Sequence, residues 1–144
     1  DLTYVGSDVE KHRPAMIHRV IFGSIERFIG ILTEHFAGKF PLWLAPVQLR
    51  LLTVTEKHNE YAKELEALFK ENGLRVEHDG RNEKIGYKIR EARNQRTPYI
   101  LVIGEREIEA RTVTVRSSKE GELGEMSPDE LIAKLKEEIE TKAC

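Results

Sequence analysis

The feature that most constrains this chain is the alternation of strand-like and helix-like segments from residue 47 onward. Residues 47–54 form an apolar segment with interspersed polar positions, which predicts a strand, and residues 74–78 predict a second, shorter strand. Residues 57–72 and 84–94 repeat apolar side chains at helical spacing. Strand, helix, strand and helix in this order favour parallel strands joined by crossover helices that pack on the sheet.

The second half of this region continues the pattern. Residues 99–103 are a continuous apolar run, which is typical of a central strand buried on both faces. Residues 106–109 and 112–117 predict two further short strands. The last helix begins at Ser127, where the sequence Ser-Pro-Asp-Glu forms a capping box. The order βαβαβββα predicts a three-layer α/β domain over residues 47–144, with a mixed, mainly parallel central sheet.

Residues 1–40 are organised differently. Residues 14–22 are rich in β-forming side chains and predict a strand, and Ser24 is placed to cap the helix that follows. The apolar side chains of this helix recur on one face: Ile25, Phe28, Ile29, Leu32 and Phe36. One strand and one helix cannot bury such faces alone. We therefore expect residues 1–40 to be the end of another domain, joined to the second domain by a connector at residues 41–46.

Charge and cysteine content exclude several classes of protein. The formal charge of −2, from 23 Lys and Arg against 25 Asp and Glu, excludes a uniformly basic nucleic-acid-coating protein. Residues 81–116 nevertheless hold nine Lys and Arg against five Glu, and residues 119–144 hold four Lys against eight Asp and Glu. The single cysteine, Cys144, excludes a disulfide framework and a cysteine-rich zinc module. The sequence shows no membrane span or secretory signal. Because it begins at Asp1 in mid-pattern without an initiator Met, we expect a fragment of a larger cytoplasmic protein.

Two residues at the start of the first helix suit an anion. Ser24 and Arg27 lie where backbone N–H groups and the helix dipole attract negative charge, and arginine binds phosphate through a fixed fork of donors. The alternative is that Arg27 belongs to an ordinary solvated helix surface. His18 has no second metal ligand at strand or helix spacing, so the sequence builds no complete metal site around it.

The basic segment suits RNA. Its positive side chains lie on or beside the helix at residues 84–94 and in the region that follows: Lys84, Lys88, Arg90, Arg93, Arg96, Arg106, Arg111 and Arg116. Such a spread of charge matches a phosphate backbone, although an ordinary charged helix surface would look the same. Asn82 and Glu107 add the donors and acceptors that single-stranded base reading needs. Gly86 costs about 1 kcal/mol relative to alanine within a helix, which close approach of either backbone or RNA would explain.

Three segments carry a family resemblance. Residues 16–32, MIHRVIFGSIERFIGIL, closely resemble the third signature motif of class II aminoacyl-tRNA synthetases in its threonyl form. Residues 34–48, EHFAGKFPLWLAPVQ, are similar to the junction of that family with its C-terminal anticodon-binding domain. Residues 79–90, DGRNEKIGYKIR, resemble the long signature of that domain. The resemblance runs in register over essentially the whole chain.

The resemblance implies a parent enzyme of the threonine–tRNA ligase family, which activates threonine with ATP and Mg²⁺ and transfers it to tRNA(Thr). Arg27 would contact an ATP phosphate, and Ser24 would line the amino-acid and adenylate pocket. His18 would be one of three zinc ligands, the others being a Cys and a His upstream of this chain. Because those ligands and the other catalytic motifs are missing here, we expect the fragment alone to be inactive and to bind neither Zn²⁺ nor ATP tightly.

The resemblance also implies that the second domain reads the anticodon. The residues that match the family's anticodon-binding positions are Asn82, Arg90, Arg96, Glu107 and Arg116. Threonine anticodons share G and U at their second and third positions, so the domain would contact these bases firmly. Lys84, Lys88 and Arg93 would position the RNA backbone. The partner would be the anticodon stem-loop of tRNA(Thr), with no membrane involved; the parent family is homodimeric, whereas we expect the fragment to be a monomer.

Two other classes of function stay open from sequence. The chain would also suit a non-catalytic, synthetase-like module that binds nucleic acid or a protein partner, although such a module would not need His18 and Arg27. It would equally suit an α/β interaction domain without an RNA role. In that case the five predicted anticodon residues would scatter over different faces of the domain.

Overall fold

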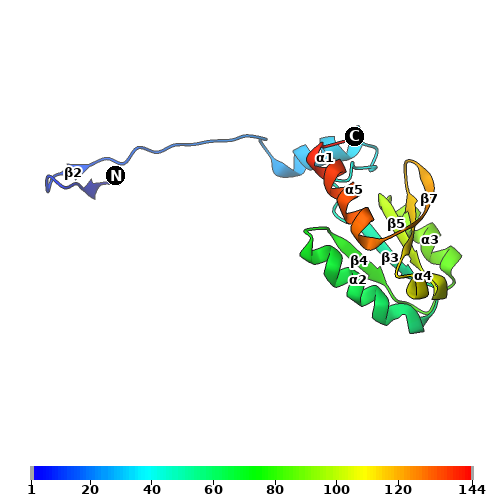
Figure 1. Ribbon diagram of the computed structural model, residues 1–144. Helices are drawn as coiled ribbons and strands as arrows, with labels where there is room; N and C mark the ends of the chain where they lie inside the picture. Colours follow the sequence, from blue (N-terminus) through cyan, green and yellow to red (C-terminus); the bar gives the residue numbers. More distant parts are fainter. Residues whose placement is uncertain (1, 144) are drawn as a thin grey trace. The chain divides into compact units, whose positions relative to one another are not determined.

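The computed structural model describes residues 2–143, so Cys144 lies outside the described residues. The chain separates into two compact units, one up to Leu32 and one from Thr33 onward (Figure 1). In residues 2–143, no helix combines the length and the hydropathy that crossing a bilayer requires.

The first unit contains little regular structure. Strands β1 (Tyr4–Val5) and β2 (Lys11–His12) pair as a short antiparallel hairpin, and helix α1 (Ile25–His35) follows Ser24. The boundary between the units falls within α1, after Leu32. The strand predicted over residues 14–22 is wrong, because these residues form neither strand nor helix and their side chains are exposed. A strand needs a neighbouring strand to pair its N–H and C=O groups, and the described part of the chain supplies none for this segment.

The helix predicted to follow Ser24 is confirmed. Ser24 Oγ accepts a hydrogen bond from the Arg27 N–H at 3.4 Å and donates one to Glu26 Oε2 at 2.8 Å. The backbone N–H of Glu26 and the Ser24 hydroxyl both lower the pKa of the Glu26 carboxyl. The apolar face of α1 is not part of a core, since none of its described residues is buried. Its Phe28 ring stacks on Phe22 with the ring centroids 4.4 Å apart.

The second unit is built on a five-stranded sheet in the order β4-β3-β5-β6-β7. The strands are β3 (Leu49–Thr53), β4 (Val76–Asp79), β5 (Tyr99–Ile103), β6 (Val113–Ser117) and β7 (Gly121–Met126). Strand β3 pairs in parallel with β4 and β5, whereas β6 pairs antiparallel with β5 and β7. The mixed α/β sheet is therefore confirmed, with parallel and antiparallel neighbours in equal number among the described residues.

Within the second unit, one predicted strand is wrong, and one observed strand is absent from the prediction. Residues 106–109 lie in helix α4 (Glu105–Ala110), whose first turn is stabilised by a hydrogen bond from the Gly104 N–H to Glu107. Strand β7 has the sequence Gly-Glu-Leu-Gly-Glu-Met, with few of the side chains that favour strands. Backbone pairing with β6 across a tight hairpin stabilises β7 as a strand despite this low local propensity.

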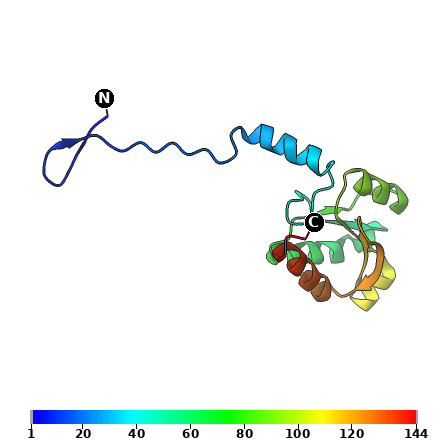
Figure 2. The ribbon, with the colours of Figure 1, turned by 90° about the horizontal axis from the view of Figure 1, so that it is seen from above.

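Helices cover the sheet on both faces, as the three-layer prediction required (Figure 2). Helix α2 (Asn59–Glu71), which follows a short 3₁₀ turn at Glu56–His58, and helix α5 (Pro128–Glu140) pack on one face. Helix α3 (Ile85–Asn94) packs on the other face in a smaller apolar cluster. The predicted cap of α5 is confirmed, because the Ser127 hydroxyl accepts a hydrogen bond from the Glu130 N–H.

The segment expected to be a connector is fixed to the second unit. Leu42 and Ala45 are buried. The Arg75 guanidinium donates hydrogen bonds to the carbonyl oxygens of Ala45 at 2.8 Å and Trp43 at 2.9 Å. Gln48 Nε2 donates to the Leu42 carbonyl at 2.9 Å. These bonds hold residues 41–46 in one conformation against the start of the sheet.

Candidate nucleic-acid interface

Helix α3 covers its face of the sheet only in part. Its buried Ala92 packs in one cluster with Leu52 of β3 and Ile100 of β5, against which the partly buried side chains of Ile85 and Ile89 also pack. Side chains alternate along a strand, and Ile100 pairs with Arg116 while Val102 pairs with Thr114. The same face therefore continues with Val102, Thr114 and Arg116, which are only half-buried. We call these three residues the open strip.

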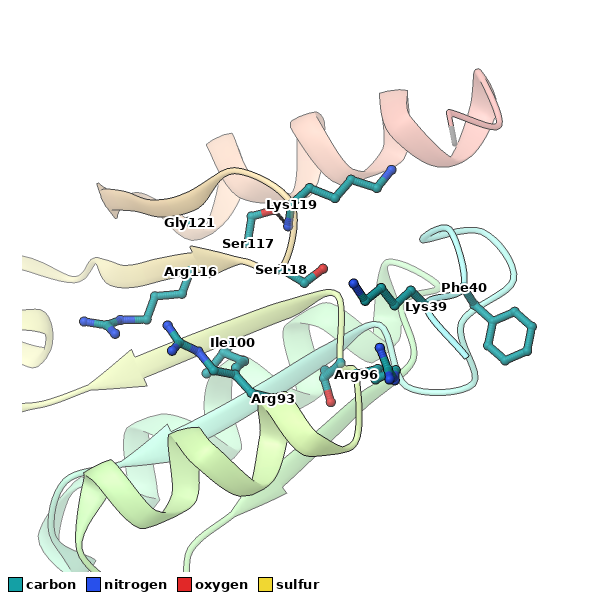
Figure 3. A pocket seen from close by; sticks show the side chains of 11 residues that line it. Lys39, Phe40, Arg93, Arg96, Ile100, Arg116, Ser117, Ser118, Lys119 and Gly121 are labelled. Carbon is teal, nitrogen blue, oxygen red and sulfur yellow. Dashed lines mark hydrogen bonds between the residues drawn. The ribbon is translucent and has the colours of Figure 1, made fainter. Parts of the chain in front are cut away.

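A cavity of about 610 Å³ lies at the Arg116 end of the open strip (Figure 3). Among its described lining residues no carboxylate is found, but five are basic: Lys39, Arg93, Arg96, Arg116 and Lys119. Figure 3 shows Arg93 on α3 and Arg116 on β6 extending to the same side. A concave surface whose charged groups are all positive concentrates anions. The cavity is therefore suited to a phosphate or to the electronegative edge of a base.

Arg116 is anchored at one donor and unpaired at another. Its Nη2 donates a 2.9 Å hydrogen bond to Glu122 Oε2 on β7. Its Nε is buried and has no partner within residues 2–143. Buried donors are nearly always paired in folded proteins. Arg116 thus keeps one unpaired guanidinium N–H inside the protein, while its side chain as a whole remains 30% exposed and lines the cavity.

Glu107 is held firmly at the other end of the open strip. Its Oε1 accepts a 2.6 Å hydrogen bond from the Thr114 hydroxyl, and its Oε2 accepts a 2.9 Å bond from the Gly104 N–H. Burial raises the pKa of Glu107, but the hydrogen bonds from Thr114 and from backbone N–H groups outweigh burial and lower this pKa overall. The carboxylate is therefore a fixed, charged acceptor at neutral pH.

The remaining predicted anticodon residues lie around α3. Asn82 is exposed in the turn before the helix, and Arg90 is exposed along it. Arg96 follows the helix with a φ of 57°, and its side chain passes close to Gly38, where a Cβ would lie 3.4 Å from Arg96 Cδ. Because α3 runs antiparallel to β5, Asn82 lies at the sheet edge where Glu107 follows β5, and Arg96 lies at the opposite edge.

Lys88 does not belong to this surface. It is 1% exposed, and its Nζ donates to the carbonyl oxygens of Thr53 at 2.9 Å and Asp79 at 3.1 Å. Burial lowers the pKa of Lys88, although the Asp79 carboxylate opposes this change. The predicted phosphate contact is therefore wrong for Lys88. Its ammonium joins the ends of β3 and β4, because position 88 falls on the inward face of α3.

Arg111 and Arg106, two other basic residues of this segment, do not line the cavity. Arg111, expected opposite the α3 surface, pairs with Glu64 of α2 at 3.2 Å and lies 5.3 Å from the centre of the Tyr61 ring. Arg106 is exposed on α4. Lys84, the N-cap residue of α3, and Arg93 within α3 are exposed, and phosphate positioning stays a prediction for both.

Sequence reasoning missed three contributors to the site. Lys39 and Lys119 line the cavity but lie outside the basic segment of residues 81–116, and nothing in their sequence context distinguishes them from other exposed lysines. Thr114 fixes the Glu107 carboxylate. The alternation of residues 113–117 carries the one available signal, since it places Thr114 on the same face as Arg116.

The predicted catalytic and zinc residues lie in the first unit. His18, Ser24 and Arg27 are exposed there. Across residues 2–143, no group of three or more His, Cys, Asp or Glu side chains is placed to hold a metal ion. The described residues therefore do not fit a zinc ion by themselves.

These features define a class of protein. The mixed sheet has one partly uncovered face, with a cavity of basic side chains at one end of the open strip and a fixed carboxylate at the other. Such a surface suits recognition of a single-stranded nucleic acid. The chain belongs to the family described as "Anticodon binding domain", which matches residues 48–138.

The relatives of the chain narrow this class. It is 60% identical over 142 residues to the threonine–tRNA ligase of Clostridium novyi and 61% identical over 143 residues to that of Caldanaerobacter subterraneus. Each alignment covers 99% of this chain and 22% of the relative. The chain thus spans about a fifth of the length of these relatives. The resemblance to threonyl-tRNA synthetases found in the sequence is confirmed.

A solved structure agrees with this relationship. The RNA-binding domain of threonyl-tRNA synthetase from Cryptosporidium parvum aligns with a TM-score of 0.75 and 38% sequence identity. The alignment covers 83% of this chain and 30% of that chain. The fold of the second unit is therefore that of a synthetase anticodon-binding domain.

Proposed function

We propose that this chain is the anticodon-reading end of a threonine–tRNA ligase, which activates threonine with ATP and transfers it to tRNA(Thr). The observation that carries the proposal is the open strip, with a row of basic side chains around a cavity at one end and a fixed carboxylate at the other. High identity to threonine–tRNA ligases over the whole chain supports the choice of threonine tRNA. Such an enzyme works in the cytoplasm.

The side chains suit the shared bases of threonine anticodons. An arginine such as Arg116 can bond a guanine at O6 and N7, and a carboxylate such as Glu107 can accept from the guanine N1–H and N2–H₂ groups. Asn82, Arg90 and Arg96 supply further donors and acceptors around the same helix. Lys84 and Arg93 would contact phosphates, and the buried Lys88 has no part in this proposal.

The first unit would act only within the full-length enzyme. There Arg27 would contact an ATP phosphate, Ser24 would line the amino-acid pocket, and His18 would be one zinc ligand of three. Zinc would supply a Lewis-acid centre that holds threonine, while Mg²⁺ would accompany ATP. The exposed apolar side chains before and along α1 are consistent with a missing partner surface. The full-length enzyme would be a homodimer, and the 144-residue chain a monomer.

The test is binding of the 144-residue chain to an anticodon stem-loop RNA. The threonine stem-loop is compared with the same RNA carrying changed second and third anticodon bases, at about 50 and 200 mM salt. We expect a preference of at least about tenfold for the threonine anticodon, which persists at the higher salt. Arg116→Ala and Glu107→Ala should each remove most of this preference.

The matched control is Arg111→Ala. It removes the same charge from an arginine that faces α2 instead of the open strip, so base preference should be unchanged. Equal binding of all RNAs by the unmodified chain, lost at the higher salt, would leave only a basic surface and would overturn the proposed anticodon reading.

A further inference from the structure

Gly86 occupies a helical position where nothing in the described part of the protein requires a glycine. It lies in the first turn of α3, its φ is not in the left-handed region, and it is exposed. A Cβ built on Gly86 meets no heavy atom of the described residues within 4 Å, apart from its neighbours and the backbone of its own helix. Neither backbone conformation nor packing within residues 2–143 therefore explains a glycine here.

The position of Gly86 relates it to the open strip. On an α-helix, residues separated by three or four positions share a face, so Gly86, Arg90 and Arg93 form one row along α3. Arg93 lines the basic cavity together with Arg116. The opposite flank of α3 carries Glu91, which accepts a hydrogen bond from Arg81. The row that contains Gly86 is therefore the one that borders the open strip.

Gly86 lies near the carboxylate end of that strip. It is at the N-terminal end of α3, at the same edge of the sheet where β5 ends and Glu107 follows. An RNA strand that extends from the basic cavity toward Glu107 would run along the row of Gly86, Arg90 and Arg93. At Gly86, two turns away from Arg93, the strand would meet bare helix backbone, because glycine has no side chain.

We propose that Gly86 is the closest approach between α3 and the bound RNA, where a nucleotide of the anticodon strand packs directly on the helix backbone. A base or ribose in van der Waals contact with a Cα needs the space that a Cβ would fill. Gly86 is thus a positioning residue, which sets how deeply the anticodon enters the site between α3 and Glu107. The inference rests on the proposed anticodon reading and adds a residue to it.

The experiment compares Gly86→Ala and Gly86→Gln with the unmodified chain in binding to the threonine anticodon stem-loop. Both replacements favour a helix, so the melting temperature should be unchanged or higher by about 3 °C. We expect Gly86→Ala to weaken binding about tenfold and Gly86→Gln to weaken it further. Weaker binding in a more stable protein separates a steric block from loss of folding.

Gly30→Ala is the matched control. Gly30 is another exposed helical glycine, in α1, whose Cβ would also meet nothing within 4 Å among the described residues. Its replacement should leave RNA binding unchanged. If the unmodified chain prefers the threonine anticodon and Gly86→Ala and Gly86→Gln bind with the same affinity and preference, the close approach at Gly86 is refuted. If the unmodified chain shows no preference, the proposed anticodon reading itself fails.

Discussion

Thr114 on β6 and Glu107 on α4 are joined by a 2.6 Å hydrogen bond from the Thr114 hydroxyl to Glu107 Oε1. The second oxygen of the same carboxylate is bound by the Gly104 N–H. With both oxygens held, the carboxylate has a fixed orientation before any ligand arrives. This matters because ordering a side chain on binding reduces affinity, whereas a side chain already ordered avoids that loss.

Thr114→Val tests this relationship, since it removes the hydroxyl and keeps the shape of the side chain. We expect a loss of about 1 kcal/mol in the free energy of unfolding, measured by urea denaturation at pH 7. We also expect the preference for the threonine anticodon to fall, because Glu107 is no longer fixed. The charge of the domain is unchanged by this substitution, so the salt dependence of RNA binding should not change.

Thr112→Val is the matched control for that experiment. The Thr112 hydroxyl is buried and has no hydrogen-bond partner in the described residues. Replacing it with a methyl group removes an unsatisfied polar group, so stability should be equal or higher. A similar loss of stability in both variants would show that the Thr114–Glu107 bond contributes nothing specific.

Tyr99 makes the free energy of unfolding of the domain depend on pH above about pH 10. Its hydroxyl donates a 2.7 Å hydrogen bond to Glu138, and burial together with this bond raises the pKa of Tyr99. A folded-state pKa above the unfolded value of about 10 contributes stability that is present below pH 10 and lost as the pH rises further. We expect stability to fall more steeply above pH 10 in the unmodified chain than in Tyr99→Phe, by up to about 1.4 kcal/mol per pH unit.

Urea denaturation of both proteins between pH 7 and 11 measures this difference. At pH 7 the Tyr99→Phe variant should be less stable by about 1 kcal/mol, because the hydrogen bond to Glu138 is lost. Parallel stability curves above pH 10 would contradict the raised pKa of Tyr99. Tyr61, whose pKa is also raised by burial, is present in both proteins and so cancels from the comparison.

The helices and buried strands of the second unit could be predicted because their signals are local. The apolar run at Tyr99–Ile103 and the capping box at Ser127 each identify an element without reference to the rest of the chain. The strand pattern of residues 14–22 misled for the opposite reason, since pairing partners decide whether a β-favouring segment becomes a strand. Residues 106–109 became helical through a cap at Gly104 that alternation of polarity does not reveal.

The sequence predicts residues of the site correctly only where the basic side chain is also exposed in the folded domain. Arg96 and Arg116 face one cavity, as a shared role requires. Lys88 was misassigned because a lysine on an amphipathic helix is expected at the surface, whereas burial depends on which carbonyl groups the folded sheet places within its reach. Lys39 and Lys119 come from distant segments, and only the folded chain brings them together.

Lys88→Met tests the structural role of the buried ammonium. Methionine fills a similar volume but leaves the carbonyl groups of Thr53 and Asp79 without this donor. We expect a loss of about 1–3 kcal/mol in the free energy of unfolding. Lys63→Met, at an exposed position of α2, should change stability by less than about 0.5 kcal/mol. Equal and small effects at both positions would show that Lys88 does not hold β3 to β4.

The arginines at the cavity can be separated into phosphate and base contacts by combining salt dependence with base preference. Arg93→Gln removes a charge on α3 that we assign to a phosphate. The slope of log K against log salt should therefore become shallower by about 0.7, while the preference for the threonine anticodon is retained. Arg93→Lys keeps the charge and should leave both quantities unchanged.

Arg116→Lys should have the opposite signature. Lysine keeps the positive charge, so the salt slope should stay the same, but it lacks the planar fork of donors that pairs with a base edge. We expect a loss of about 1–3 kcal/mol in discrimination against changed anticodon bases, measured from binding constants at several salt concentrations. If Arg116→Lys retained full discrimination and Arg93→Lys lost it, the two roles would have to be exchanged. The charge of the cavity alone cannot produce this difference, because both lysine variants preserve it.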